Sequence, residues 1–142
     1  MRKKKPDGSS EVVIPSDPTA TRSVREDIES ALKQHHFDER EIFCVQLALE
    51  EALVIAIKHG NQMDPSKQIH VSYHIDDERC EIRVEDEGVG FDPQDLPDPH
   101  HEESLERPTG RGILLMRHFM TEVTYYPPGN RMCMCKLRNG QK

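Results

Sequence analysis

The most distinctive chemical group in the sequence is Asp86-Glu87-Gly88-Val89-Gly90, which directly follows the hydrophobic run of residues 80–85. A carboxylate that leaves a strand ahead of two glycines can point into a cleft while the backbone bends tightly behind it. Such a corner can bind a purine. The same pattern also occurs as a plain turn, because Asp-x-Gly-x-Gly arises by chance in many loops.

A second group lies upstream, on a predicted helix. Glu51, Ile55 and Lys58 are spaced at i, i+4 and i+7, so all three are expected to face one direction. The adjacent pair Glu50-Glu51 also fits an ordinary solvated helix face. The helical spacing alone therefore leaves a functional and a structural interpretation open.

The third group is Gly110-Arg111-Gly112, a glycine pair directly before an apolar helix over residues 113–120. Glycines let the backbone approach a phosphate, and a helix N-terminus offers unpaired N–H groups and the positive end of the helix dipole. Arg111 adds a charged donor. In isolation, these glycines equally suit a loop-to-helix junction.

Two helices precede the aspartate corner. The first is predicted over about residues 16–34, where Pro18 suits the first turn and apolar residues recur at helical spacing. The second is predicted over about residues 38–59, because Asp38 and Glu41 form a capping-box pattern ahead of a broad apolar stripe and Gly60-Asn61 closes the helix. This second helix is expected to be central and well buried.

Strands and one long loop complete the pattern. Alternating or β-rich runs predict strands over residues 12–14, 69–75, 80–85, 122–126 and 132–137. Residues 91–108 are rich in proline and acids and read as a mobile loop. The pair His100-His101 in this loop could bind a metal with Glu102 and Glu103, but a solvated lid is the preferred interpretation.

Composition limits the class of protein. The 142 residues fit one domain over residues 11–142, and the net charge of −7 argues against nucleic acid as the principal partner. The basic run Arg2-Lys3-Lys4-Lys5 lies in residues 1–10, which are expected to form a disordered tail. No apolar segment approaches the length of a membrane span, and no signal-peptide pattern follows the basic start. A cytoplasmic protein with no membrane partner is therefore expected.

The four cysteines suit buried free thiols rather than disulfides. Cys44, Cys80, Cys133 and Cys135 lie in or near apolar elements and show no CxxC spacing. Cys133 and Cys135 are two apart on a predicted strand and so share one face, where a metal or redox pair is conceivable. Packing in the core is the preferred prediction for both.

The order of these motifs resembles a known arrangement. The helix of Glu51, then Asp86-x-Gly88-x-Gly90, then Gly110-x-Gly112 is similar to the N, G1 and G2 boxes of the ATP-binding superfamily of DNA gyrase, heat-shock chaperones and sensor histidine kinases. The short chain and the phrases Leu-Glu-Glu-Ala-Leu and Gly-Arg-Gly-Ile-Leu-Leu-Met look most like the bacterial anti-sigma-factor serine kinases. The resemblance covers about residues 11–138. Those proteins bind a sigma factor and phosphorylate a small antagonist of it.

The resemblance implies a fold and a base-binding site. The fold is α+β, a two-layer α/β sandwich in which a mixed, mostly antiparallel sheet carries helices on one face, the histidine-kinase-like ATPase fold. Asp86 would accept a hydrogen bond from the adenine amino group, which selects adenine over guanine. Gly88 and Gly90 would let the chain fold against the base.

The resemblance also implies a phosphate site. Gly110, Arg111 and Gly112 would hold the phosphates of ATP, and the loop over about residues 93–109 would act as a lid. Lys58 would lie near the phosphates.

Catalysis depends on the N box, where one departure occurs. Glu51 would be the general base that takes the proton from a substrate serine hydroxyl. The family places an Mg²⁺-binding Asn four residues after this Glu, but here the position is Ile55, which has no ligand atom. Asn61 is a poor substitute, because six further residues of regular helix place it about 120° off that face.

Two functions follow from the resemblance. The first is an ATP-dependent serine/threonine protein kinase and anti-sigma factor that regulates transcription by partner switching, with a sigma factor and its antagonist as partners and with homodimerisation possible. The second is a regulatory binding module of the same fold that has lost catalysis, which Ile55 favours. Under this second hypothesis the module holds nucleotide weakly or not at all and regulates by docking to a sigma factor, an antagonist or another signalling protein.

Overall fold

The alternating apolar residues after position 68 build the central hairpin of the molecule. Strand β3 (Gln68–Ile75) and strand β4 (Arg79–Asp86) pair antiparallel along their full length. Asp76 closes the turn between them, because its carboxylate accepts hydrogen bonds from two backbone N–H groups of the turn. The hairpin therefore ends at Asp86, as the sequence predicts.

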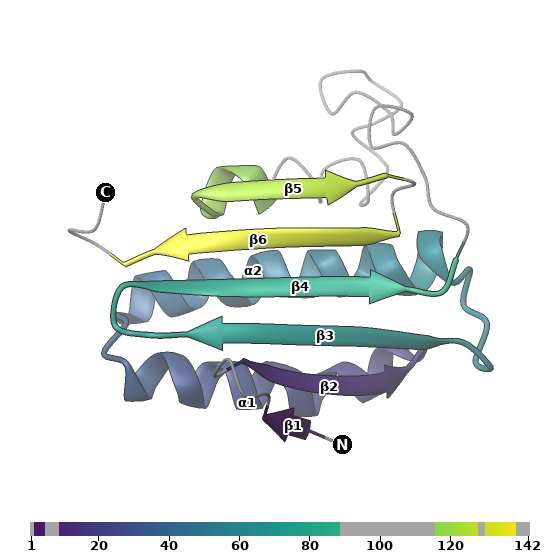
Figure 1. Ribbon diagram of the computed structural model, residues 1–142, viewed down its shortest axis with the longest axis horizontal. Coiled ribbons are helices and arrows are strands. Elements are labelled where there is room, and N and C mark those ends of the chain that lie inside the picture. The colour runs from purple at the N-terminus through teal and green to yellow at the C-terminus, as the bar shows by residue number, and fades with distance from the viewer. Residues whose placement is uncertain (1, 5–8, 89–115, 128–129, 139–142) are drawn as a thin grey trace.

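The sheet extends on both sides of this hairpin. The computed structural model describes residues 2–4, 9–88, 116–127 and 130–138. In this part of the chain six strands follow the order β1-β2-β3-β4-β6-β5, and every ladder between them is antiparallel (Figure 1). The predicted α+β sandwich is confirmed, with a described sheet that is wholly antiparallel rather than mixed. The remaining strands are β1 (Arg2–Lys4), β2 (Ser10–Pro15), β5 (Glu122–Tyr126) and β6 (Arg131–Leu137).

Helix α1 (Thr21–Gln34) begins later than the sequence predicts. A short 3-10 turn, η1 (Pro18–Ala20), precedes it, and Asp17 caps this turn by accepting a hydrogen bond from the Thr19 N–H at 2.9 Å. The predicted apolar stripe is confirmed, because the helix buries Val24, Ile28 and Leu32.

Helix α2 (Glu39–Ile55) is the buried central helix. The predicted capping box is present: the Asp38 carboxylate accepts from the Glu41 N–H at 2.7 Å, and the Glu41 carboxylate accepts from the Asp38 N–H at 2.9 Å. The helix does not continue regularly to position 59. It changes at Ala56 into a π-helical turn, η2 (Ala56–Gly60). Within the described ranges, no helix is both long enough and apolar enough to cross a membrane.

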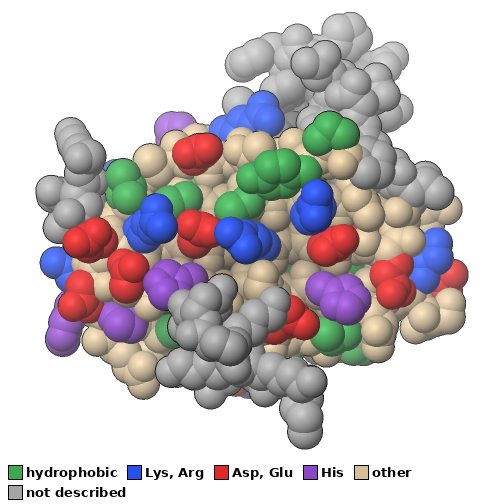
Figure 2. Space-filling view, in the orientation of Figure 1, with side chains coloured by type: hydrophobic (Ala, Val, Ile, Leu, Met, Phe, Trp, Pro, Cys, Tyr) green, Lys and Arg blue, Asp and Glu red, His purple; other side chains and the backbone are tan. Residues whose placement is uncertain are grey.

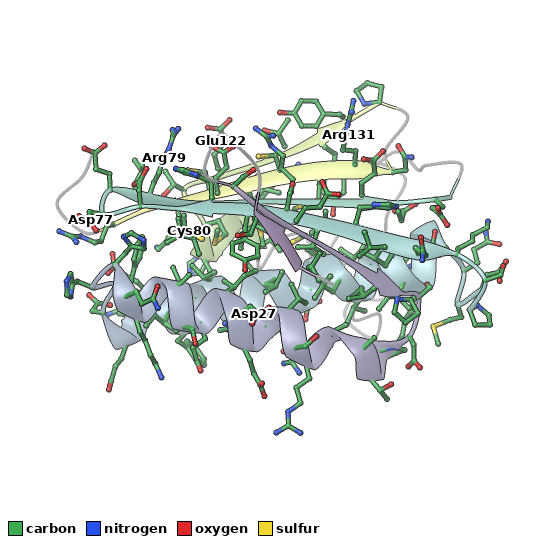
Figure 3. All side chains as sticks on the ribbon, turned by 60° about the horizontal axis from the view of Figure 1, so that its bottom comes forward. Asp27, Asp77, Arg79, Cys80, Glu122 and Arg131 are labelled. Atoms are coloured by element: carbon green, nitrogen blue, oxygen red, sulfur yellow. The ribbon has the colours of Figure 1, made fainter. Side chains whose placement is uncertain are left out.

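The two layers enclose one hydrophobic core. The helices cover a single face of the sheet, toward which Cys80 points, whereas Arg79, Glu122 and Arg131 point away (Figure 3). Strand residues on the core face are almost fully buried because they alternate with outward residues. They include Val12, Ile14, Ile69, Val71, Ile82, Val84, Met132 and Met134.

The opposite face of the sheet is open and polar. Acidic and basic side chains alternate over the part that is visible in Figure 2. Glu81 forms ion pairs with Arg83 at 2.9 Å and with Arg79 at 3.8 Å along β4. Such exposed pairs contribute little stability, so this face is held in place by the core on the other side.

Two cysteines lie on this open face, contrary to the prediction that they pack in the core. Cys133 and Cys135 are half-buried free thiols, whereas Cys44 and Cys80 are buried as predicted. The register explains the error, because Met132 and Met134 occupy the core positions of β6. Alternation predicted the shared face of the two cysteines but not which face it is.

The N-terminal residues also differ from the expected tail. The sequence predicts a disordered segment over residues 1–10, but Arg2–Lys4 form the edge strand β1 and pair with β2. Ser10 is the first residue of β2, which is longer than the predicted run.

Candidate functional site

Asp86 is held in a fixed position at the end of β4, on the face that packs against the helices. Its side chain is only 5% exposed. The Gly88 N–H donates a hydrogen bond to Asp86 Oδ1 at 2.8 Å, and the Asp86 N–H donates to the carbonyl of Asn130 at 2.9 Å. The carboxylate is therefore restrained by its own loop, and the backbone of Asp86 is restrained by the start of β6.

Two glycines let the chain close around this carboxylate. A Cβ atom at position 60 would overlap the carboxylate of Asp86, and a Cβ atom at position 88 would overlap the carbonyl of Gly60. Any other residue at either position would push the end of η2 away from β4. Gly88 was predicted from its motif, whereas Gly60 was predicted only as a helix end.

Burial changes the acidity of the site. Desolvation raises the pKa of Asp86 to about 6, the nearby charge of Glu85 adds to the rise, and the Gly88 hydrogen bond and the charge of Lys67 oppose it. A carboxylate that is kept in a dry environment interacts strongly with a hydrogen-bond donor of a ligand. Perturbed pKa values of this kind are concentrated at functional sites.

Asp86 faces a small hollow between α2 and the sheet. The hollow has a volume of about 10 Å³, the space of a single water molecule, so a purine ring enters only if the lining opens. The lining combines apolar side chains with the Asp86 carboxylate. It consists of Ala52, Ile55, Ala56, Val84, Asp86, Tyr125, Asn130, Arg131 and Met132.

Helix α2 presents the predicted N-box residues to this region. Ile55 lines the hollow of Asp86 and is 2% exposed. Glu51 lies one turn earlier, where burial and the charge of Glu50 raise its pKa and the charge of Lys58 opposes them. A raised pKa suits a carboxylate that must accept a proton near neutral pH.

Lys58 does not line the hollow of Asp86, although its charge acts on Glu51. It lines a separate hollow of about 240 Å³ between α1 and α2, together with Arg25, Glu50 and other residues of both helices. The prediction that Glu51, Ile55 and Lys58 face one direction assumed a regular helix, but the π turn η2 begins between Ile55 and Lys58. The structure thus brings Ile55 to Asp86 and places Lys58 on the side of α1.

Comparison with known proteins identifies the family. The family described as the histidine kinase-like ATPase domain matches residues 14–136 of the chain. The chain belongs to the histidine kinase-like ATPase family. The hollow between α2 and the end of β4 is therefore the candidate nucleotide site of this ATPase domain.

Several relatives of the chain within this family are named as RsbW kinases or anti-sigma F factors. The serine-protein kinase RsbW of Listeria innocua is 28% identical over 133 residues, covering 89% of this chain and 85% of its own. RsbW of Bacillus subtilis is 27% identical over 139 residues, covering 93% and 87%. An anti-sigma F factor of Clostridium perfringens is 30% identical over 105 residues, covering 70% and 74%. These relatives confirm the resemblance to the anti-sigma-factor serine kinases.

A solved structure confirms the fold. The crystal structure of the RsbU and RsbW domains of Rv1364c from Mycobacterium tuberculosis matches 92% of this chain with a TM-score of 0.62 and 16% identity. The chain spans about a third (32%) of that longer protein. At this level of identity the similarity supports the architecture alone.

Several predicted site residues lie outside the described residues. They are Gly90, the lid over residues 93–109 with His100 and His101, and the phosphate-binding motif Gly110, Arg111 and Gly112. Their roles stay predictions from the sequence.

The residues at the predicted metal position do not fit Mg²⁺. Ile55 offers no oxygen, and both polar side-chain atoms of Asn61 are bonded to the backbone. Among the described residues, no group of three or more His, Cys, Asp or Glu side chains is arranged to hold a metal ion.

Asn61 is the site residue that sequence reasoning missed. It was judged only as a replacement metal ligand, although it is completely buried, with 0% exposure, beside the Asp86 corner. A polar residue directly after a predicted helix-ending glycine gave a weak signal. Its contacts depend on the π turn and on the ends of two strands, one of which is 26 residues away at Glu87.

Proposed function

We propose that the chain is an ATP-binding serine/threonine protein kinase of the anti-sigma-factor type. The observation that carries the proposal is the buried carboxylate of Asp86, with a pKa raised to about 6, at the end of β4 in a histidine kinase-like ATPase domain. Among the relatives, the name serine-protein kinase RsbW supports this reaction and the name anti-sigma F factor supports the regulatory role.

Asp86 recognises the adenine base in this proposal. One carboxylate oxygen is held by the Gly88 N–H, which leaves acceptor capacity for the exocyclic amino group of adenine. Guanine offers a carbonyl oxygen at that edge, which a carboxylate repels. Gly88 and Gly90 allow the loop to lie against the base.

The remaining roles follow from the family motifs. Gly110, Arg111 and Gly112 hold the phosphates beneath the lid over residues 93–109, and Lys58 contributes a nearby positive charge. Glu51 takes the proton from the serine hydroxyl of the substrate protein, for which its raised pKa is suited.

The substrate and the partners are proteins. The proposed substrate is a small anti-sigma-factor antagonist with a phosphorylatable serine, and the proposed second partner is a sigma factor, between which the kinase exchanges in the cytoplasm. A homodimer is proposed as well.

A second function is favoured by one specific observation. Ile55 stands where the family has its metal ligand, which favours a regulatory module that binds its protein partners without catalysis. The two functions share the fold and the docking role and differ in phosphate transfer.

Transfer of labelled phosphate distinguishes them. The purified chain is incubated with γ-labelled ATP, Mg²⁺ and the serine-bearing antagonist protein of its own genome. The kinase proposal predicts label on the antagonist, lost in Glu51→Gln and kept in Glu50→Gln, the matched carboxylate that is exposed on the same helix. An unlabelled antagonist under conditions where it binds the chain would refute the kinase and support the binding module.

A further inference from the structure

Asn61 connects three segments at the Asp86 corner. Its side-chain amide donates a hydrogen bond to the carbonyl of Gln68 at 3.0 Å, and its side-chain oxygen accepts one from the Glu87 N–H at 2.8 Å. The residue itself follows η2, while Gln68 begins β3 and Glu87 directly follows β4. One buried carboxamide thus joins the end of the helix to both strands of the central hairpin.

The two backbone groups that Asn61 binds would otherwise face each other. Ile69 and Asp86 form the last pair of the β3–β4 ladder, so Gln68 and Glu87 occupy the next pairing position. The carboxamide stands between them and replaces the direct N–H to carbonyl bond of that position. Glu87 also accepts a hydrogen bond from the Gln68 N–H at 2.7 Å through its own side chain. Immediately after Asp86, the two strands are therefore linked through side chains instead of by direct hydrogen bonds between their backbones.

This arrangement controls the surroundings of the Asp86 carboxylate. The residue before Asn61 is Gly60, whose backbone contacts the carboxylate so closely that no Cβ fits between them. The residue after Asp86 is Glu87, whose N–H is fixed by Asn61. Asn61 therefore sets the distance between the π turn and the corner without entering the hollow.

Only a carboxamide of this length satisfies both strands. An aspartate keeps an acceptor for Glu87 but has no donor for Gln68, and an alanine leaves both buried backbone groups without their partner. We propose that Asn61 is a positioning residue that holds Asp86 in the geometry required for adenine recognition. This inference rests on the proposed nucleotide-binding function.

The decisive variant is Asn61→Ala, compared with Gln46→Ala. Gln46 is the matched control because its carboxamide also donates to a backbone carbonyl, that of Arg25 at 3.0 Å, but between α1 and α2. Asn61→Ala loses two partly buried hydrogen bonds and Gln46→Ala loses one, so both are expected to lose some stability. Only Asn61→Ala is expected to weaken ATP binding, by about tenfold or more, and to lower the preference for ATP over GTP.

A readout without nucleotide separates this inference from the proposed function. The titration of the Asp86 carboxyl is followed by carbon NMR in the wild type and in both variants. In Asn61→Ala, water reaches the corner and the pKa of Asp86 falls toward its ordinary value, whereas Gln46→Ala leaves it unchanged. The other charged or titratable groups around Asp86 stay in place in both variants: Glu85, Lys67, Tyr125 and Arg131.

The variant Asn61→Asp provides a second test in case Asn61→Ala does not fold. It is close in shape and keeps the acceptor for Glu87, but its charge near Asp86 raises the pKa of that carboxyl, opposite to the effect of alanine. An unchanged Asp86 titration in a folded Asn61→Ala or Asn61→Asp protein would overturn the positioning role. If the wild type binds no ATP while the titration shifts as predicted, the proposed function fails and the structural control of Asp86 by Asn61 remains.

Discussion

At the scale of single residues, the buried charge of Asp86 lowers the stability of the fold but favours the binding of a ligand. Its carboxylate is buried with one backbone N–H bond, and the raised pKa means that burial disfavours the charged form. A purely structural residue at this position would more simply be neutral. The retained charge is explained by a ligand that donates a hydrogen bond to it.

The substitution Asp86→Asn is therefore expected to stabilise the fold and to weaken the binding of ATP. Asparagine keeps an acceptor for the Gly88 N–H and removes the buried charge, so the free energy of unfolding at pH 8 should rise by about 1 to 3 kcal/mol. Affinity for ATP should fall by about 1 to 3 kcal/mol because the adenine amino group loses its charged acceptor. Urea unfolding and calorimetry measure the two quantities.

The gain in stability should also depend on pH. The pKa of Asp86 is raised from 3.8 when unfolded to about 6 when folded, so the wild type is penalised above pH 6 and not below pH 4. The difference between wild type and variant should therefore close as the pH falls through this window. A variant that is less stable than the wild type at pH 8 would contradict the assignment of burial as the cause.

Ligand binding should follow the same ionisation. The ionised carboxylate is the better acceptor, so affinity for adenosine should fall about tenfold for each pH unit below 6. Adenosine carries no phosphate, which removes the titration of the ligand's phosphates from the comparison. Fluorescence or NMR titrations from pH 8 to pH 5 test this, and Asp86→Asn should give a flat profile. A wild-type profile as flat as that of the variant would exclude Asp86 from the base site.

At the scale of elements, α2 positions most of the site. Its start is fixed by the capping box of Asp38 and Glu41, and its end is fixed by the π turn η2 against the Asp86 corner. Ile55 and Glu51 lie between these two fixed ends. Changes at either end of the helix should therefore have separable effects on stability and on binding.

The substitution Asp38→Ala tests the fixed start of α2. Loss of the N-cap acceptor should lower the free energy of unfolding by about 1 kcal/mol, because the Glu41 N–H loses its partner. The neighbouring exposed substitution Glu39→Ala, which removes no capping bond, should cost less. Chemical unfolding of both variants makes the comparison, and equal losses would mean that the cap contributes nothing specific.

The substitution Ile55→Asn tests the missing metal ligand. It restores the family's side-chain oxygen beside the Asp86 hollow and should increase the Mg²⁺ dependence of ATP affinity or turnover. The control is Ile57→Asn, another isoleucine that is almost fully buried but lines the hollow between α1 and α2. Both variants should lose stability, since a polar group is buried in each. If Ile55→Asn gains no Mg²⁺ response, position 55 is not the missing ligand site.

Local sequence patterns predicted an element well where the spacing of its apolar residues alone decides whether it is a helix or a strand. The apolar stripe of α1, the capping box of α2 and the alternation of β3 and β4 were read directly from the sequence. The same alternation could not say which face of β6 is buried, because Met132 and Met134 are as apolar as Cys133 and Cys135. The π turn was also missed, since it depends on close packing of Gly60 against the Asp86 corner.

At the scale of the whole molecule, the fold brings distant segments together at one corner. The end of η2, the start of β3, the end of β4 and the start of β6 meet around Asp86 through hydrogen bonds of its neighbours. The motif predicted Asp86 and Gly88, but Gly60, Asn61 and Asn130 become site residues only through this topology. No local pattern encodes a meeting of four segments of which the last, at Asn130, lies 44 residues beyond Asp86.

The measurement that tests the account most directly is a calorimetric titration of the purified chain with ATP and ADP, each with and without Mg²⁺. The account predicts binding of one nucleotide per chain that is strengthened by Mg²⁺, although Ile55 supplies no oxygen to the metal. The absence of binding, or binding whose affinity does not depend on Mg²⁺, would contradict the proposal that the chain is a kinase. It would support the second function, a regulatory binding module.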